Sequence, residues 1–148
     1  MKFFADASFL YNIYYPEQTF STAARRLWQR EQLRVHASIA VILEFRLGAL
    51  WENENEIGWQ AFVEDKQAGR VTEVGVNWDS LFSEFEPLVL RFGKRAQPRL
   101  LDGLHVLAAR QIGATHFISF DHRSRQRAFA RAVGLQVLPE RIPGEFGS

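Results

Sequence analysis

The sequence predicts a single α/β domain, a three-layer α/β/α sandwich with a central, mostly parallel sheet. Short apolar runs of strand length alternate with longer stretches of helical period, the order typical of parallel sheets with helices on both faces. The chain has 148 residues, of which 47% are hydrophobic, so it can bury one core without a disulfide or metal staple. It has no cysteine, which suits a reducing cytosol.

Five short apolar runs are predicted to be strands, because each has strand length and is bounded by capping or turn-forming residues. They are residues 3–5, 33–37, 71–76, 116–120 and 135–138.

The helices between these strands are predicted from apolar residues at helical spacing and from signals at the helix ends. Ser38 and Asn77 are expected N-caps, Gly69 and Gly134 are expected C-caps, and Pro16 ends the first helix. Pro87 is expected to kink or stop the helix that contains it. The predicted helices span residues 8–15, 19 or 21 to 30, 39–50, a stretch ending near 68, 78–92, 100–112 and 123–133.

Two predicted strands end in an aspartate, Asp6 and Asp121. The carboxyl ends of parallel strands face the ligand crevice, so these two acids converge if their strands are neighbours. Taken alone, Asp6 is more simply explained as the cap of the next helix. Once the other acids are considered, we expect Ser8 to take that capping role.

Two further acids lie in apolar surroundings. Glu44 lies between Leu43 and Phe45 in a helix that is expected to be mostly buried. Burial of its carboxylate costs free energy unless a metal or an arginine such as Arg46 neutralises the charge. Asp102 lies in the first turn of the helix that leads to the strand before Asp121.

Four crowded carboxylates repel one another and raise their pKa values unless a divalent cation neutralises them. Carboxylate oxygens are the ligands that Mg²⁺ and Mn²⁺ prefer, and such a site fits metal-assisted phosphodiester hydrolysis.

The basic residues point to a nucleic-acid substrate. Net charge is only +1, yet residues 91–131 hold nine bases and two acids, and 15 of the 18 basic residues are arginine. The planar guanidinium matches phosphate, although a solvated basic surface explains most of these arginines equally well.

Four motifs in order, within residues 4–138, resemble those of a PIN domain, most closely the VapC-type ribonuclease toxins of bacterial and archaeal toxin–antitoxin pairs. They are Phe4-Ala-Asp6-Ala-Ser8 for D-x-S/N, Ala37-Ser-Ile-Ala-Val-Ile-Leu-Glu44 for S-x5-E, Leu101-Asp-Gly-Leu-His-Val-Leu-Ala-Ala109 for D-x-L-H/I-x-A-x-A, and Ile118-Ser-Phe-Asp121 for T/S-x-D.

The resemblance implies a Mg²⁺-dependent endoribonuclease, with Mn²⁺ as an alternative, that cleaves RNA with metal-activated water. It implies the toxin of a type II pair, a homodimer, and a cognate antitoxin whose helix lies in an apolar groove, formed in part by the aromatic residues of the first quarter. The implied metal-binding and catalytic acids are Asp6, Glu44, Asp102 and Asp121, with Ser8 and Ser119 as supporting hydroxyls.

Near the last motif the chain departs from the family pattern. Ser124 stands where the family often has a further acid, which leaves the number of metals open. Arg123, Arg125 and Arg127 are predicted to contact the RNA backbone, with a solvated helix face as the alternative. His105 is interpreted as a packed, hydrogen-bonded residue rather than a general base.

Two other functions are considered. One is a catalytically silent PIN-like module that binds RNA or a protein. The other is a phosphoacceptor receiver domain, which is disfavoured because the strand at 71–76 ends in no acid. We expect one domain over residues 1–140 in a cytoplasmic protein without a membrane helix. Residues 141–148 are expected to form a tail, with Gly144–Ser148 similar to a cloning remnant.

Overall fold

The computed structural model describes residues 1–53 and 56–145, except for the side chains of 51–53. Within that part of the chain, one sheet of five parallel strands has the order β3-β2-β1-β4-β5. The central sheet that the sequence predicts is therefore confirmed. The strands are β1 (Phe3–Ala5), β2 (Val35–Ser38), β3 (Val71–Val74), β4 (His116–Ile118) and β5 (Gln136–Leu138).

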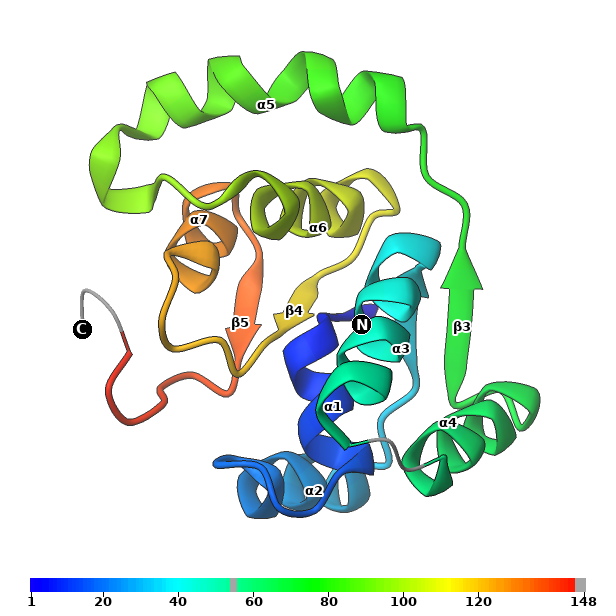
Figure 1. Cartoon of the computed structure of the whole chain (residues 1–148). Helices are drawn as coiled ribbons and strands as arrows, with labels where there is room; N and C mark the ends of the chain where they lie inside the picture. The colour runs from blue at the N-terminus through cyan, green and yellow to red at the C-terminus, as the bar shows by residue number, and fades with distance from the viewer. Residues whose placement is uncertain (54–55, 146–148) are drawn as a thin grey trace.

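The helices form two groups, one on each face of the sheet. The helix α1 packs against α2, α3 and α4, whereas α6 packs against α5 and α7, and Figure 1 shows the two groups apart from each other. The three-layer arrangement is thus also confirmed. The helices are α1 (Ala7–Tyr14), α2 (Ser21–Arg30), α3 (Ile39–Asn53), α4 (Ile57–Gln67), α5 (Trp78–Phe92), the 3-10 turn η1 (Lys94–Ala96), α6 (Leu100–Gln111) and α7 (Gln126–Ala132).

The strands β1 and β4 are neighbours, as the argument from their terminal aspartates requires. Phe3 pairs with His116 and Ala5 with Ile118, and the amide of Asp6 extends the ladder by donating to the Ile118 carbonyl at 3.0 Å. From β1 the chain builds the sheet outward through β2 and β3, and it then returns to add β4 and β5 on the other side. The sheet therefore has its topological switch point between β1 and β4.

The core is rich in aromatic rings. Phe4 and Phe117 stack on neighbouring strands, and Phe45 and Phe129 are fully buried on the two helical layers. Most of the aromatic residues in the first quarter are core residues, whereas Tyr11 and Phe20 remain partly exposed. The helix α5 continues through Pro87, which is exposed.

The helix α3 is less buried than its sequence suggests. Its N-cap is Ser38, as predicted, since Ser38 Oγ accepts a hydrogen bond from the Val41 amide at 3.2 Å. One face nevertheless carries exposed apolar side chains, so the expectation of a mostly buried helix is wrong. These are Ile39, Leu43, Leu47 and Leu50, which are 43%, 52%, 63% and 44% exposed.

The last described residues pack against the domain. Ile142 and Glu145 are both buried, although they fall in the segment expected to be a tail. Residues 146–148 lie outside the described part of the chain. None of the described helices is both long enough and apolar enough to span a membrane.

Candidate metal centre

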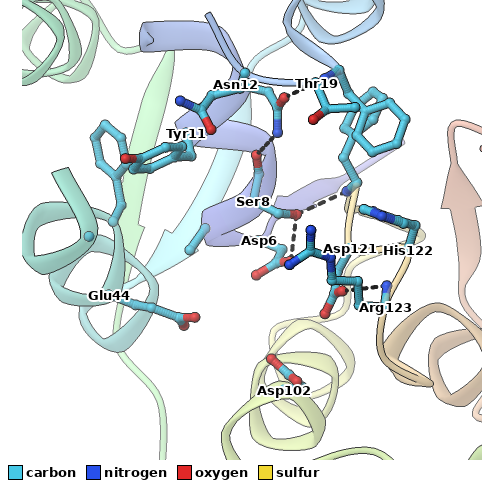
Figure 2. Close-up of a pocket in the computed structure, with 16 residues that line it drawn as sticks. Asp6, Ser8, Tyr11, Asn12, Thr19, Glu44, Asp102, Asp121, His122 and Arg123 are labelled. Atoms are coloured by element: carbon cyan, nitrogen blue, oxygen red, sulfur yellow. Dashed lines mark hydrogen bonds between the residues drawn. The ribbon is translucent and has the colours of Figure 1, made fainter. Parts of the chain in front are cut away.

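A cleft of about 540 Å³ opens at the carboxyl ends of β1 and β4. Open α/β sheets bind ligands at this position, where the strand order reverses. All four acids that the sequence singles out line the cleft: Asp6 after β1, Glu44 on α3, Asp102 on α6 and Asp121 after β4. Figure 2 shows the side chains of Asp6, Glu44 and Asp102 directed toward the same space.

Asp6 lies at the base of the cleft and is almost fully buried. Its backbone occupies the N-cap position of α1, but its side chain makes no capping bond. Instead, Asp6 Oδ2 accepts hydrogen bonds from the hydroxyls of Ser8 at 2.8 Å and Ser119 at 2.9 Å. Burial raises the pKa of Asp6 and the Glu44 charge adds to it, against the opposing effects of His105 and the two hydroxyls. The predicted capping role of Ser8 is wrong, because its hydroxyl holds Asp6 and accepts from the Phe120 amide.

Ser119 connects Asp6 to the layer formed by α6 and α7. Its hydroxyl lies 2.9 Å from Asp6 Oδ2 and 3.0 Å from Gln126 Oε1, and it accepts from the Asp121 amide at 3.1 Å. The fully buried Gln126 donates through Nε2 to the Asp102 carbonyl at 3.0 Å. Sequence reasoning missed Gln126, because a single glutamine in a basic helix carries no motif.

Glu44 is partnered by His105 rather than by Arg46. His105 Nε2 lies 2.6 Å from Glu44 Oε2, whereas Arg46 pairs with Glu56 at 2.8 Å. The imidazole is fully buried, and its Nδ1 has no hydrogen-bond partner among the residues that the structure describes. Burial acts to lower the pKa of His105, but the Glu44 bond and the charges of Asp6, Glu44 and Asp102 raise it overall. His105 is thus the packed, hydrogen-bonded residue that the sequence suggests, and it also faces the acids.

Asp102 is partly exposed, but its environment disfavours a negative charge. Burial, followed by the charges of Asp6, Asp121 and Glu44, raises its pKa to about 7. Near neutral pH this carboxyl group is therefore partly protonated in the folded protein. A divalent cation in the cleft would remove that penalty by neutralising the repulsion.

Asp121 is held by its own loop. Its Oδ1 accepts from the amides of Arg123 at 3.0 Å and Ser124 at 3.2 Å, and its Oδ2 accepts from the Ser124 hydroxyl. This turn occupies residues 122–124, so α7 begins at Gln126 and not at 123 as predicted. A short polar side chain that bonds to the backbone just after it commonly organises such a turn.

The donors in the cleft fit a divalent cation. Asp6, Glu44 and His105 each offer one ligand atom, and the three atoms lie within 4.8 Å of one another. Asp102 and Asp121 add two carboxylates at the same cleft. Carboxylate oxygens suit Mg²⁺ and Mn²⁺, so the acids of the cleft are the donors that fit these cations.

The three arginines predicted to contact RNA lie in three different environments. Arg123 is exposed and lines the metal cleft, and Arg125 lines a neighbouring cleft. Arg127 is 1% exposed and pairs with the buried Glu145 at 2.8 Å. Its guanidinium also donates to the carbonyls of Ser119, Leu138 and Pro139. The prediction for Arg127 is therefore corrected: this side chain is a structural one.

Two solved structures resemble the chain over almost its whole length. VapC20 from Mycobacterium tuberculosis, a toxin that cleaves the sarcin-ricin loop, matches 92% of this chain and 98% of its own, with 19% identity and a TM-score of 0.65. FitAcB from Neisseria gonorrhoeae matches 91% of this chain and 95% of its own, with 16% identity and a TM-score of 0.59. The fold is that of a PIN domain. No family model matches the sequence, and no curated protein matches it significantly.

Within this fold the four motifs converge although they lie far apart in the chain. The first and last motifs end the adjacent strands β1 and β4, and the second and third lie on α3 and α6, which belong to opposite helical layers. Ser124, the departure from the family pattern, bonds to Asp121 and so takes part in shaping the cleft.

Proposed function

We propose that the protein is a divalent-metal-dependent endoribonuclease, the toxin of a type II toxin–antitoxin pair, with Mg²⁺ as its metal and Mn²⁺ as an alternative. The observation that carries this is the convergence of four carboxylates and His105 at the switch point of a PIN fold. A structural neighbour, VapC20, cleaves the sarcin-ricin loop, which supports RNA as the substrate. We place the activity in the cytoplasm, where RNA is accessible.

The residues of the cleft have two roles: some would bind the cation, and others hold those ligands in position. Asp6, Glu44, Asp102 and Asp121 would hold the cation, which when bound supplies activated water and neutralises charge on the phosphate. Ser8 and Ser119 fix the Asp6 carboxylate, and His105 fixes Glu44, so the acids keep their positions despite mutual repulsion.

The test is cleavage of a structured RNA by purified protein, with either Mg²⁺ or Mn²⁺. Asp6→Asn, Glu44→Gln and Asp102→Asn are each expected to lower the rate about 100-fold or more, because each removes a charged metal ligand. Asp79→Asn is the matched control, since Asp79 is exposed on α5 and does not line the cleft.

Activity that survives EDTA, or full activity in Asp6→Asn, would contradict the metal mechanism. RNA binding without measurable Mg²⁺ or Mn²⁺ binding in calorimetry would instead identify a catalytically silent RNA-binding module.

We also propose two protein partners. A second copy of the chain would cover the exposed apolar face of α3, because side chains such as Leu47, which is 63% exposed, are poorly placed in water. A cognate antitoxin would contact the partly exposed aromatic side chains of Tyr11 and Phe20 at the mouth of the metal cleft.

A further inference from the structure

A second cleft, of about 550 Å³, lies between the start of α6, the start of α7 and the turn η1. Three cationic side chains line it, Lys94, Arg99 and Arg125. Its apolar part is formed by Phe85, Pro98 and Leu100. None of the described residues that line this basic cleft is acidic, whereas the metal cleft has four acids.

The basic cleft and the metal centre are built on the same turn of α6. Gly103 follows Asp102, and a Cβ atom at Gly103 would lie 2.4 Å from Phe85 Cε2 and 2.7 Å from Pro98 Cγ. The apolar part of the basic cleft is therefore packed directly on the turn that presents Asp102. Arg125 likewise lies four residues after Asp121, in the loop that leads from β4 to α7.

Two of the three cationic side chains of the basic cleft are available for an anion. Lys94 and Arg99 are exposed, and neither forms an ion pair with any acid in the described part of the chain. A cluster of like charges with a low-dielectric wall attracts counter-ions. The chain as a whole has a net charge of +1, so attraction of a polyanion depends on such local clusters.

The metal centre alone is a poor attractor for RNA, because its carboxylates repel phosphate until a cation neutralises them. Affinity for the strand must come from cations outside the acid cluster. The basic cleft is adjacent to that cluster, and its apolar part offers a surface for a ribose or the edge of a base.

We propose that the basic cleft binds a backbone phosphate of the RNA strand whose scissile phosphate lies in the metal centre, through Lys94, Arg99 and Arg125. This proposal rests on the proposed function for the identity of the polyanion. RNA is favoured over an acidic peptide, because a strand that enters the metal centre extends past the same turn of α6.

The experiment measures binding of a fluorescein-labelled RNA hairpin by anisotropy, in EDTA so that metal-dependent cleavage is suppressed, at several salt concentrations. Lys94→Ala with Arg99→Ala is expected to raise Kd about tenfold. It should also lower the slope of log Kd against log salt concentration by about 0.7, since one phosphate contact on a single strand contributes about 0.7.

The matched control is Arg34→Ala with Arg110→Ala. It removes the same charge from two exposed arginines at the opposite edge of the sheet, just before β2 and near the end of α6. This control should bind the hairpin like the wild type. In cleavage assays with metal, the Lys94/Arg99 variant should show a raised KM and an unchanged kcat.

Equal affinity and salt slope in the wild type and the Lys94/Arg99 variant would overturn the proposal and leave the ribonuclease function standing. An equal loss in the control variant would also overturn it, because the effect would then be one of net charge. Failure of the wild type to cleave RNA, with hairpin binding that still depends on Lys94 and Arg99, would overturn the ribonuclease function alone.

Discussion

Asp102 and Asp6 have carboxyl groups whose surroundings oppose their charge. Burial raises the pKa of both carboxyl groups, and the charges of three nearby acids add to it at Asp102. The imidazole of His105 acts in the opposite direction on both. Perturbed pKa values of this kind gather at functional sites, because function there requires groups that stability alone would not favour.

The raised pKa of Asp102 predicts how stability depends on pH. This pKa is about 7 in the folded protein and near its usual 3.8 in the unfolded chain, so the folded state binds more protons between these values. In metal-free buffer, stability should therefore fall as the pH rises from about 4 to about 7. Asp102→Asn, which cannot ionise, should be more stable than the wild type above about pH 7, by about 1–2 kcal/mol after solvent screening.

Urea denaturation in EDTA at several pH values measures the free energy of unfolding of the wild type and of Asp102→Asn. The difference between the two proteins should become smaller below about pH 4, where the Asp102 carboxyl group of the wild type is protonated in both the folded and the unfolded state. Asp79→Asn, on the exposed side of α5, keeps Asp102, so its stability should follow that of the wild type at each pH. An Asp102→Asn protein that is no more stable than the wild type at alkaline pH would contradict the account of the Asp102 environment.

Among the elements, α7 holds the C-terminal segment to the end of the sheet. Arg127 on α7 pairs with Glu145 and donates to three backbone carbonyls. They belong to Leu138 at the end of β5, to Pro139 just after it, and to Ser119 beside the metal centre. Arg131, one turn later, reaches the same Glu145 at 3.1 Å but is itself exposed. The helix thus joins residues 139–145 to the segment that carries Ser119.

Arg127→Met is expected to lower the free energy of unfolding by about 3–5 kcal/mol, because it removes the buried partner of the Glu145 carboxylate and three hydrogen bonds to backbone carbonyls. Arg131→Met should lower the free energy of unfolding by less than about 1 kcal/mol, since the Arg131 side chain that pairs with Glu145 is exposed to solvent. Guanidinium denaturation of both variants measures the two losses of stability. Equal costs would show that the buried pair does not stabilise the segment.

At the scale of the whole molecule, α3 presents an apolar face to solvent. Its exposed side chains include Leu43, Leu47 and Leu50, while Glu44 of the same helix lines the metal cleft. A stable dimer buries about 800 Å² on each partner, more than one row of side chains supplies. The α3 face would therefore form the centre of a larger contact.

Leu47→Glu is expected to convert a dimer into a monomer, because it places a charge in the centre of that contact. Light scattering after size-exclusion chromatography gives the mass of each variant. Ile57→Glu is the control, since Ile57 is 73% exposed on α4, and this variant should remain dimeric. A wild-type protein that is monomeric at high concentration would contradict the dimer.

The sequence by itself determined the order of strands and helices and the positions of the four acids. These signals are local: strand-length apolar runs, caps such as Ser38, and an aspartate directly after each of two strands. In a parallel sheet the carboxyl ends of the strands lie at the same edge. Because β1 and β4 are neighbours, Asp6 and Asp121 come close together.

Only the tertiary structure decided the partners of these acids. The pairing of His105 with Glu44 and the contact of Gln126 with Ser119 and Asp102 join segments that lie apart in the chain, as does the burial of Arg127 against Glu145. No local pattern encodes such contacts, because they depend on how distant helices pack. In the sequence, Arg127 has the pattern of a surface residue because it lies in a basic segment. Its burial becomes possible only in the folded protein, where a carboxylate pairs with it and offsets the cost of removing its charge from water.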